Sequence, residues 1–397
     1  MLANLLFGVG FLVCVWIGFL YFRDLGDVSQ MVLKVRRENM LRFIRNEYRL
    51  LAIGLGAGLL AAVAHLGFGG GQRPLFWIMI ILIGLFYAVP WVYVHLGLRN
   101  QMNSARYFPI AEAMKFIAPA TGVVVIEKDG VARAHPDPHM MRPHMAGNAE
   151  GLGGEDVVMT YCAMANLGVG YTPEIEGERL DLEVLAQHGN NLILRDNTTG
   201  EPIQHIYGHR DRGGPAMRPW PTFRMTFRGF ARAYPDGTVF LNKPPSNPLL
   251  ALFDTIMDVA FSWGIARQHS EAEPIMDNMT RRDDRMPAKT YVWGIDIDGD
   301  ATCYTQEFVI SENGPVNATV GGRAIVAAYH PEFESLGVWY NDTGAPVSSI
   351  DFFGQSDRGA LPRADRLKAG LFWHVWAEFF PQTDINRTGA GEADKAA

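Results

Sequence analysis

The sequence predicts a membrane-anchored α+β protein, in which three transmembrane helices precede a β-rich, duplicated domain of barrel-like or sandwich-like form. Three observations predict this fold: three apolar runs in the first hundred residues, a change to short β-branched segments from about residue 107, and similarity between two halves of the later part. The net charge of −7 offers no basic face for phosphates, so no nucleic-acid partner is expected.

Residues 3–22, 50–70 and 74–98 are the three apolar runs. Each has about twenty residues, which is the length a helix needs to cross a bilayer. Pro90 is expected to kink the third helix, because proline has no N–H to donate. Small residues of the second run would let a neighbouring helix approach closely; they are Gly54, Gly56, Gly58, Ala61 and Ala62. We therefore expect an integral inner (plasma) membrane protein whose first partner is the lipid bilayer.

Basic residues predict the orientation of these helices. The connection between the first two runs carries Arg23, Lys34, Arg36, Arg37, Arg42, Arg45 and Arg49, whereas the next connection carries only Arg73. Because basic loops stay in the cytoplasm, three spans put the soluble domain in the cytoplasm as well, with a periplasmic domain as the alternative. Residues 31–51 are typical either of a basic amphipathic helix on the inner leaflet or of a solvated connecting helix.

From about residue 107 onward, short strands alternate with turn residues. Residues 123–135 and 171–184 are predicted to be hairpins, which turn at Asp129-Gly130 and near Glu176-Gly177. Four pairs of segments are similar and follow one another in the same order: 126–135 with 295–304, 148–162 with 317–330, 167–171 with 336–340, and 230–239 with 376–385. This order indicates an internal duplication.

The similarity divides the chain into a transmembrane region (1–106), a first β-rich repeat (107–245), a helical and charged linker (246–288), a second β-rich repeat (289–388) and a disordered tail (389–397). The first half of the linker has helical apolar spacing, which suits a helix that covers the β-rich domain or touches the membrane surface.

The most distinctive short stretch is HPDPHMMRPHM, residues 135–145. His135, His139 and His144 could surround a metal ion together with Cys162, and imidazole, thiolate and thioether ligands suit copper or zinc. The alternative is an ordered loop in which prolines set the path, methionines pack and histidines bind carbonyl groups. In the second repeat, the positions that match His135 and Cys162 are Tyr304 and His330, so ligand-capable groups gather in the first repeat.

Cys162 with His144 is also a candidate catalytic pair, with the thiol as nucleophile and the imidazole as its base. The alternative is a small buried cysteine in a β-rich core.

The β-rich part resembles the family catalogued as domain of unknown function 3179, over residues 120–388. The resemblance rests on VNATVGG (316–322), DNTTGEPIQHIYG (196–208), RRDDRMPAKTYVWGI (281–295) and the strand end TYC (160–162). It implies the fold and the repeat, but no activity. Family members typically have a CxxC sequence at the strand end, whereas this chain keeps Cys162 and has Ala165 at the second position. A disulfide switch or tetrathiolate zinc site at this strand end is therefore excluded within this chain.

Asp196 and Gln204 stand at motif positions of that resemblance, and His205 follows them. Gln204, His205 and Asp196 are candidate ligand-binding residues, although Asp196 with Gly200 is favoured as a turn. The alternating charges of residues 281–285 are typical of a solvated linker, or could join the two repeats through Arg–Asp pairs.

Together these patterns predict a membrane-tethered binding or redox-accessory protein with a candidate metal site in the first repeat. Two alternatives remain open: an enzyme that uses Cys162 and His144 on a small molecule, and a scaffold that serves other membrane-protein subunits.

Overall fold

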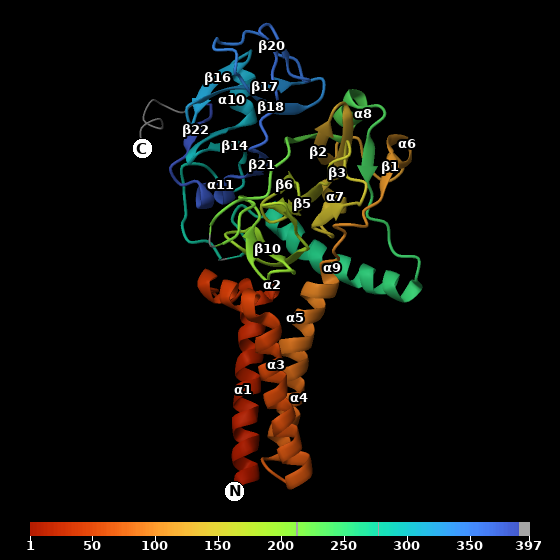
Figure 1. The fold of residues 1–397 in the computed structure, drawn as a ribbon, viewed down its shortest axis with the longest axis vertical. Coiled ribbons are helices and arrows are strands. Elements are labelled where there is room, and N and C mark those ends of the chain that lie inside the picture. The colour runs from red at the N-terminus through yellow and green to blue at the C-terminus, as the bar shows by residue number, and fades with distance from the viewer. Residues whose placement is uncertain (212, 277, 389–397) are drawn as a thin grey trace.

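The computed structural model describes residues 1–211, 213–276 and 278–388, which form a helical stalk and a β-rich head (Figure 1). The stalk, residues 1–98, is a bundle of long helices with the N-terminus at its far end. The head comprises the described residues from 99 to 388 and contains the strands. The predicted tail, 389–397, lies outside the described residues.

Four helices are long and apolar enough to cross a membrane: Leu2–Leu25, Arg37–Phe68, Arg73–Gly97 and Pro248–Ser270. They support the predicted association with a membrane. The first three, which contain the predicted runs, are α1 (Leu2–Leu25), α3 (Arg37–Phe68) and a continuous helix made of α4 (Arg73–Ile83), η1 (Gly84–Ala88), α5 (Val89–Trp91) and η2 (Val92–Gly97). The fourth is α9 (Pro248–Ser270), in the segment expected to be a linker. The structure therefore has one more candidate span, by length and composition, than the three runs that the sequence predicts.

Small residues let the stalk helices approach closely, as expected. A Cβ atom on Gly58 would lie 2.9 Å from the Cys14 sulfur of α1, and one on Gly54 would collide with the Tyr87 hydroxyl. That hydroxyl donates to the Cys14 carbonyl oxygen (2.6 Å). Two π-helical turns, η1 and η2, lie on either side of Pro90, where the chain accommodates the missing N–H.

The basic segment at the start of α3 contacts the head. It continues directly into the second stalk helix, with a break in the helical backbone at Asn46 (φ −122°, ψ 17°). Arg37 pairs with Asp211 (2.7 Å), and Arg45 pairs with Asp211 (3.0 Å) and Glu201 (3.2 Å). The segment therefore docks on the head.

The first part of the head is built on two antiparallel hairpins that the sequence predicts. Asp129 and Gly130 turn the first hairpin with φ of 51° and 82°, and Glu176 and Gly177 turn the second with φ of 55° and 83°. The strands form one sheet in the order β1 (Tyr107–Pro109), β13 (Thr238–Phe240), β3 (Val131–Pro136), β2 (Gly122–Lys128) and β12 (Thr222–Thr226), a second in the order β4 (Met145–Gly147), β5 (Val158–Cys162) and β6 (Leu167–Tyr171), and the pair β7 (Glu174–Ile175) and β8 (Glu178–Arg179).

The later part of the head has a matching set of strands. One sheet has the order β21 (Leu367–Phe372), β14 (Tyr291–Ile297), β15 (Asp300–Tyr304) and β22 (Asp384–Asn386), a second has the order β16 (Val316–Val320), β17 (Arg323–His330) and β18 (Ser335–Tyr340), and the small pair is β19 (Gln355–Ser356) with β20 (Gly359–Ala360). In both sets the first strand of the hairpin pairs antiparallel with a later strand, β2 with β12 and β14 with β21. The second strand of the hairpin pairs parallel with the last strand of the set, β3 with β13 and β15 with β22.

A further sheet, β11 (Pro202–Gln204), β10 (Asn191–Asp196) and β9 (Leu182–His188), has no counterpart among the described strands of the second set. No sheet of the described residues closes on itself, so the barrel form is not found. The short helices of the head are α6 (Ile110–Ala113), α7 (Asp137–Met140), α8 (Phe227–Ala233), α10 (Gln306–Ser311) and α11 (Trp373–Phe379); α2 (Asp27–Gln30) joins α1 to α3.

The stalk and the head share one hydrophobic core. Met40 and Ile44 of α3 belong to the same buried cluster as Val184 and Leu194 of the sheet β11-β10-β9. Figure 1 shows α9 lying across the end of the stalk, between the stalk and the head. This junction is where the candidate site residues gather.

Candidate functional site

His144 and Cys162 line the same cavity, at the junction of head and stalk. His144 directly precedes β4, and Cys162 ends β5, so antiparallel pairing of these strands brings the two residues to one edge. The opposite wall comes from α9, with Phe261 and Gly264, and from Met31 between α2 and α3. The cavity offers about 60 Å³ to water-sized molecules, which is room for roughly four waters.

The His144 imidazole is buried and neutral. Its Nδ1 lies 3.4 Å from the Met140 carbonyl oxygen, which can only accept, so this nitrogen carries the proton. The ring packs edge-to-face with Phe261, at 6.3 Å between centroids. Burial lowers the pKa of His144 to about 4. The imidazolium form is therefore disfavoured at neutral pH.

The Cys162 thiol is fully buried and donates to the Asn190 carbonyl oxygen (3.5 Å). A reactive cysteine needs a group that stabilises its thiolate, such as an imidazolium. Because His144 resists protonation, a thiolate–imidazolium pair between the two is disfavoured. The structure brings the predicted pair to one cavity, and the lowered pKa of His144 disfavours the imidazolium form that would stabilise a thiolate.

Gln187 of β9 is the polar residue of this cavity that the sequence analysis did not identify. Its side chain is 3% exposed, and its Nε2 donates to the Met276 sulfur (2.9 Å). Its Oε1 is buried and has no hydrogen-bond partner among the described residues. A buried amide oxygen without a partner costs about 1–3 kcal/mol, so it favours a ligand that donates a hydrogen bond.

A second buried polar group lies behind the cavity and contains two of the predicted ligand-binding residues. The His205 ring bonds Thr160 through Nε2 (2.9 Å) and Asn191 through Nδ1 (3.1 Å). Gln204 donates to the Asn191 side chain (2.9 Å). Burial lowers the pKa of His205 to about 3, so it is neutral. Gln204 and His205 therefore brace β5 against β10 and β11.

Asp196, the third predicted ligand-binding residue, forms a turn. Its carboxylate accepts from the backbone N–H of Thr198 (3.2 Å) and from the Thr199 hydroxyl (2.6 Å). The Gly200 N–H donates to the Asp196 carbonyl oxygen (2.7 Å), and Gly200 has a φ of 74°. The structural interpretation of Asp196 and Gly200 is confirmed.

His135 and His139 do not join His144 and Cys162. His135 is enclosed in the first sheet, where its Nε2 bonds the Tyr107 hydroxyl (3.1 Å), and burial lowers its pKa to about 3. His139 lies on α7 and accepts from the Asn242 N–H (3.2 Å). Among the described residues no group of three His, Cys, Asp or Glu side chains could hold a metal ion. The expected four-residue copper or zinc site is therefore not assembled among the described residues, because His135 bonds Tyr107 and His139 bonds Asn242.

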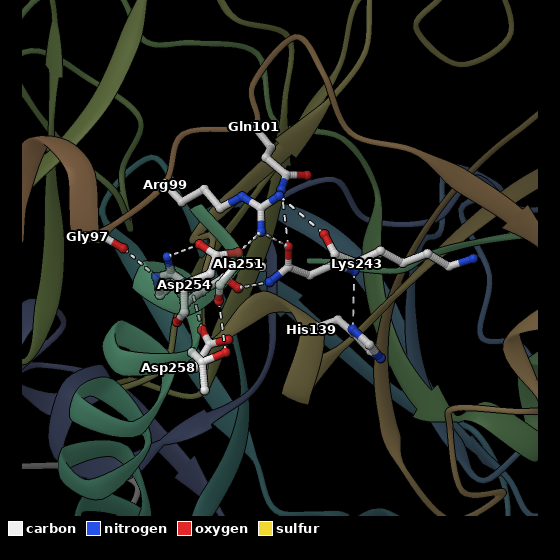
Figure 2. A network of polar contacts seen from close by, with 11 residues as sticks. Gly97, Arg99, Gln101, His139, Lys243, Ala251, Asp254 and Asp258 are labelled. Atoms are coloured by element: carbon white, nitrogen blue, oxygen red, sulfur yellow. Dashed lines mark hydrogen bonds and ion pairs between the residues drawn. The ribbon is translucent and has the colours of Figure 1, made fainter. Parts of the chain in front are cut away.

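His139 borders a polar network that holds the start of α9 (Figure 2). Arg142 donates to the Gly97 carbonyl oxygen (2.5 Å), and pairs with Asp254 and with Asp258 (2.5 Å). Arg99 pairs with Asp254 as well (2.7 Å). The network thus joins the end of the stalk, the histidine-rich loop and α9.

A second charged network, which the sequence analysis did not identify, joins the stalk to the sheet β11-β10-β9. Arg195 of β10 pairs with Glu47 of α3 (2.5 Å) and with Glu183 of β9 (2.9 Å). His95 of η2 contacts the same two carboxylates (2.9 and 2.7 Å), and Tyr21 donates to Glu47 (3.0 Å). The available signal was an acidic residue between basic and apolar segments close to a membrane span.

The Arg–Asp pairs found among the described residues of segment 281–285 lie within that segment. Arg285 pairs with Asp283 (2.7 Å) inside the segment. It also donates to the carbonyl oxygens of Pro381 (2.9 Å) and Thr383 (3.2 Å), which belong to the later strand set. The segment is therefore anchored on that set alone by these contacts.

Comparison with known proteins places these features in a family. The family model described as protein of unknown function (DUF3179) matches residues 101–383, which covers most of the head and more than half of the chain. No curated protein and no solved structure matches the chain. The resemblance seen in the sequence motifs is confirmed, and the chain belongs to the DUF3179 family.

Proposed function

We propose that this protein is a membrane-tethered binding protein, whose cavity takes the polar end of a small, mostly apolar molecule that carries a hydrogen-bond donor. The observation that supports this function best is Gln187, which lines the cavity and whose buried Oε1 has no hydrogen-bond partner among the described residues. A hydroxyl or N–H group of a ligand would supply the missing hydrogen bond.

The other walls specify the rest of the ligand. Phe261, Leu192 and Ile265 are apolar, and Met31 and Met164 present flexible thioethers that adapt to shape. A free space of about 60 Å³ holds a small head group but no large molecule. We therefore propose that the tail of the ligand extends past Met31 and toward the membrane, which fits an amphiphile that arrives from the bilayer.

Binding is better supported than the other functions considered. The low pKa of His144 disfavours an activated Cys162 thiolate, which an enzyme of the predicted kind would need. The separation of His135 and His139 from the cavity removes two of the four expected metal ligands. Ligand binding in the cavity requires neither an activated thiolate nor a bound metal ion.

A matched pair of probes tests the proposed function: 1-butanol, which donates a hydrogen bond, and 1-chlorobutane, which does not. The readout is the rate at which methyl methanethiosulfonate modifies Cys162 in the full chain, measured by peptide mass spectrometry. Protection by 1-butanol should be saturable and about fivefold stronger than protection by 1-chlorobutane, because one net hydrogen bond contributes about 1 kcal/mol.

Two variants serve as controls. Gln187→Met should remove the difference between the probes and leave binding of 1-chlorobutane intact. Gly264→Met should fill the cavity and abolish protection by both, whereas Gly264→Ala should not, because its Cβ would meet only the Met31 methyl group at 3.9 Å. Protection that is not saturable, or that persists in Gly264→Met, would refute binding in this cavity.

We further propose that the head lies in the cytoplasm. The basic connection between α1 and α3 docks on the head through Arg37 and Arg45, so head and connection share one side of the membrane. A reporter that works only in the periplasm, fused after Ala397, should be inactive. Activity of that reporter would place the head in the periplasm instead.

We also infer that the two strand sets arose by duplication, with units at about 107–245 and 289–388 joined by 246–288. The four similar segment pairs lie on matching elements: β2–β3 with β14–β15, β5 with β17, β6 with β18, and α8–β13 with α11–β22. Limited proteolysis supports these units if it cuts first between them and leaves two resistant fragments, and it argues against them if the first cuts fall inside a strand set.

A further inference from the structure

Helix α9 has an apolar stripe along its outer face. The stripe residues recur at spacings of three and four, which puts them on one side of a helix. They are Leu249, Leu252, Ile256, Val259 and Trp263, with exposed fractions of 76, 59, 58, 67 and 59%. A continuous exposed stripe of this size in water would promote aggregation, so we expect it to be covered by another molecule.

The opposite face of α9 is held by the head near its middle and near its C-terminal end. Near the middle, Arg142 pairs with Asp254 and Asp258, as Figure 2 shows for the labelled aspartates. Near the end, Gln268 donates to the Met164 carbonyl oxygen (2.8 Å) and His269 bonds the Ala163 carbonyl oxygen (2.8 Å). The middle and the C-terminal end of the helix therefore contact the same domain.

This attachment is incompatible with a span. A helix of 23 residues is about 34 Å long, so a spanning α9 would have its ends on opposite sides of the membrane. The head cannot contact both the middle and the C-terminal end of the helix in that case, because the middle would lie inside the bilayer. Asp258, which is half exposed, would also enter the hydrocarbon layer.

The buried face of α9 packs against the end of the third stalk helix. Tyr93 of η2 stacks on Phe261 of α9, at 4.5 Å between ring centroids, and a Cβ on Gly97 would collide with the Met257 methyl group. Figure 1 shows α9 lying crosswise where the stalk meets the head. The outer face of α9 is thus at the level where the three spans leave the membrane.

We propose that α9 lies in the plane of the membrane, with its stripe in the acyl-chain layer of the leaflet that faces the head. The chain then crosses the bilayer three times, and α9 is an interfacial helix. This arrangement holds the head at a set distance and orientation on the membrane, and it does not depend on whether the cavity binds a ligand.

Nitroxide labels along the stripe test this proposal. Single cysteines replace Leu252, Ile256, Val259 and Trp263 in the full chain, which is placed in nanodiscs of phosphatidylcholine and phosphatidylglycerol. Collision rates with oxygen and with a nickel chelate then report depth. The unsubstituted chain, treated identically, measures labelling of the buried native cysteines, and labels at Leu59 and Ser311 serve as bilayer and water references.

An in-plane helix predicts similar depths at all four positions, about 5–10 Å into the interface. A depth that rises toward the middle of α9 and falls toward both ends would show a span and overturn the proposal. Access to the nickel chelate as high as at Ser311 would show a stripe in water. Low access to both oxygen and the nickel chelate would show that a second protein, and not lipid, covers the stripe. A stripe in water and a stripe covered by protein would each overturn the proposal.

Discussion

Replacing Arg195 by methionine should destabilise the contact between the stalk and the head. The guanidinium is 3% exposed and pairs with Glu47, which is fully buried, and with Glu183. Methionine keeps most of the side-chain volume but removes both ion pairs. The carboxylate of Glu47 then stays buried with only His95 and Tyr21 as partners.

The expected cost follows from this burial. Removing one partner of a buried ion pair destabilises a protein by about 3–5 kcal/mol, because the remaining charge stays away from water. At about 2 °C per kcal/mol, the Tm of a chain of this size should fall by about 6–10 °C. The double variant Glu47→Met, Arg195→Met should be milder than the sum of the two single variants, because it leaves no unpaired carboxylate on α3.

Thermal unfolding of the detergent-solubilised chain measures this effect, followed by tryptophan fluorescence. Arg179→Met is the matched control, because Arg179 pairs with Asp156 (2.6 Å) at the surface, where it is 48% exposed. That variant should lose under about 1 kcal/mol. If Arg195→Met were as mild as Arg179→Met, the network would not connect stalk and head as the geometry indicates.

Three further predictions use other contacts. Burial lowers the pKa of His205 to about 3, so below about pH 6.5 the unfolded chain binds a proton that the folded chain does not. The free energy of unfolding should therefore fall as the pH drops from 6.5, and this residue contributes about 1.4 kcal/mol per pH unit. His205→Gln should lower that slope in thermal melts between pH 5.5 and 7.5, and an unchanged slope would contradict the prediction. Gly58→Leu should cost about 1–3 kcal/mol by separating α1 from α3, whereas Gly56→Leu, which has open space around its Cβ, should be nearly neutral; equal changes in Tm would argue against this packing. Asn247→Ala should cost about 1 kcal/mol, because the Asn247 side chain accepts from the N–H groups of Leu249 and Leu250 at the start of α9, and Asn247→Asp should restore the Tm.

Features that depend on neighbouring residues could be predicted from the sequence. The stalk helices follow from apolar runs of membrane length, and the turns at Asp129-Gly130 and Glu176-Gly177 follow from residues that tolerate positive φ. The turn at Asp196 is equally local, since its carboxylate bonds residues two and three positions later. The placement of His144 and Cys162 in one cavity was also expected, although their catalytic chemistry is not supported by the geometry.

By itself, the sequence determined the apolar stalk, the strand-rich head, the hairpin turns and the family. The tertiary structure decided what those elements do together. Arg195 and Glu47 lie 148 positions apart, and Arg142 and Asp258 lie 116 positions apart, so no local pattern reports either contact. Composition also cannot separate α9 from a span, because a helix in the membrane plane and one across it bury similar apolar residues. Only the head contacts at the middle and the C-terminal end of α9 distinguish the two, since they depend on where the folded head places its partners.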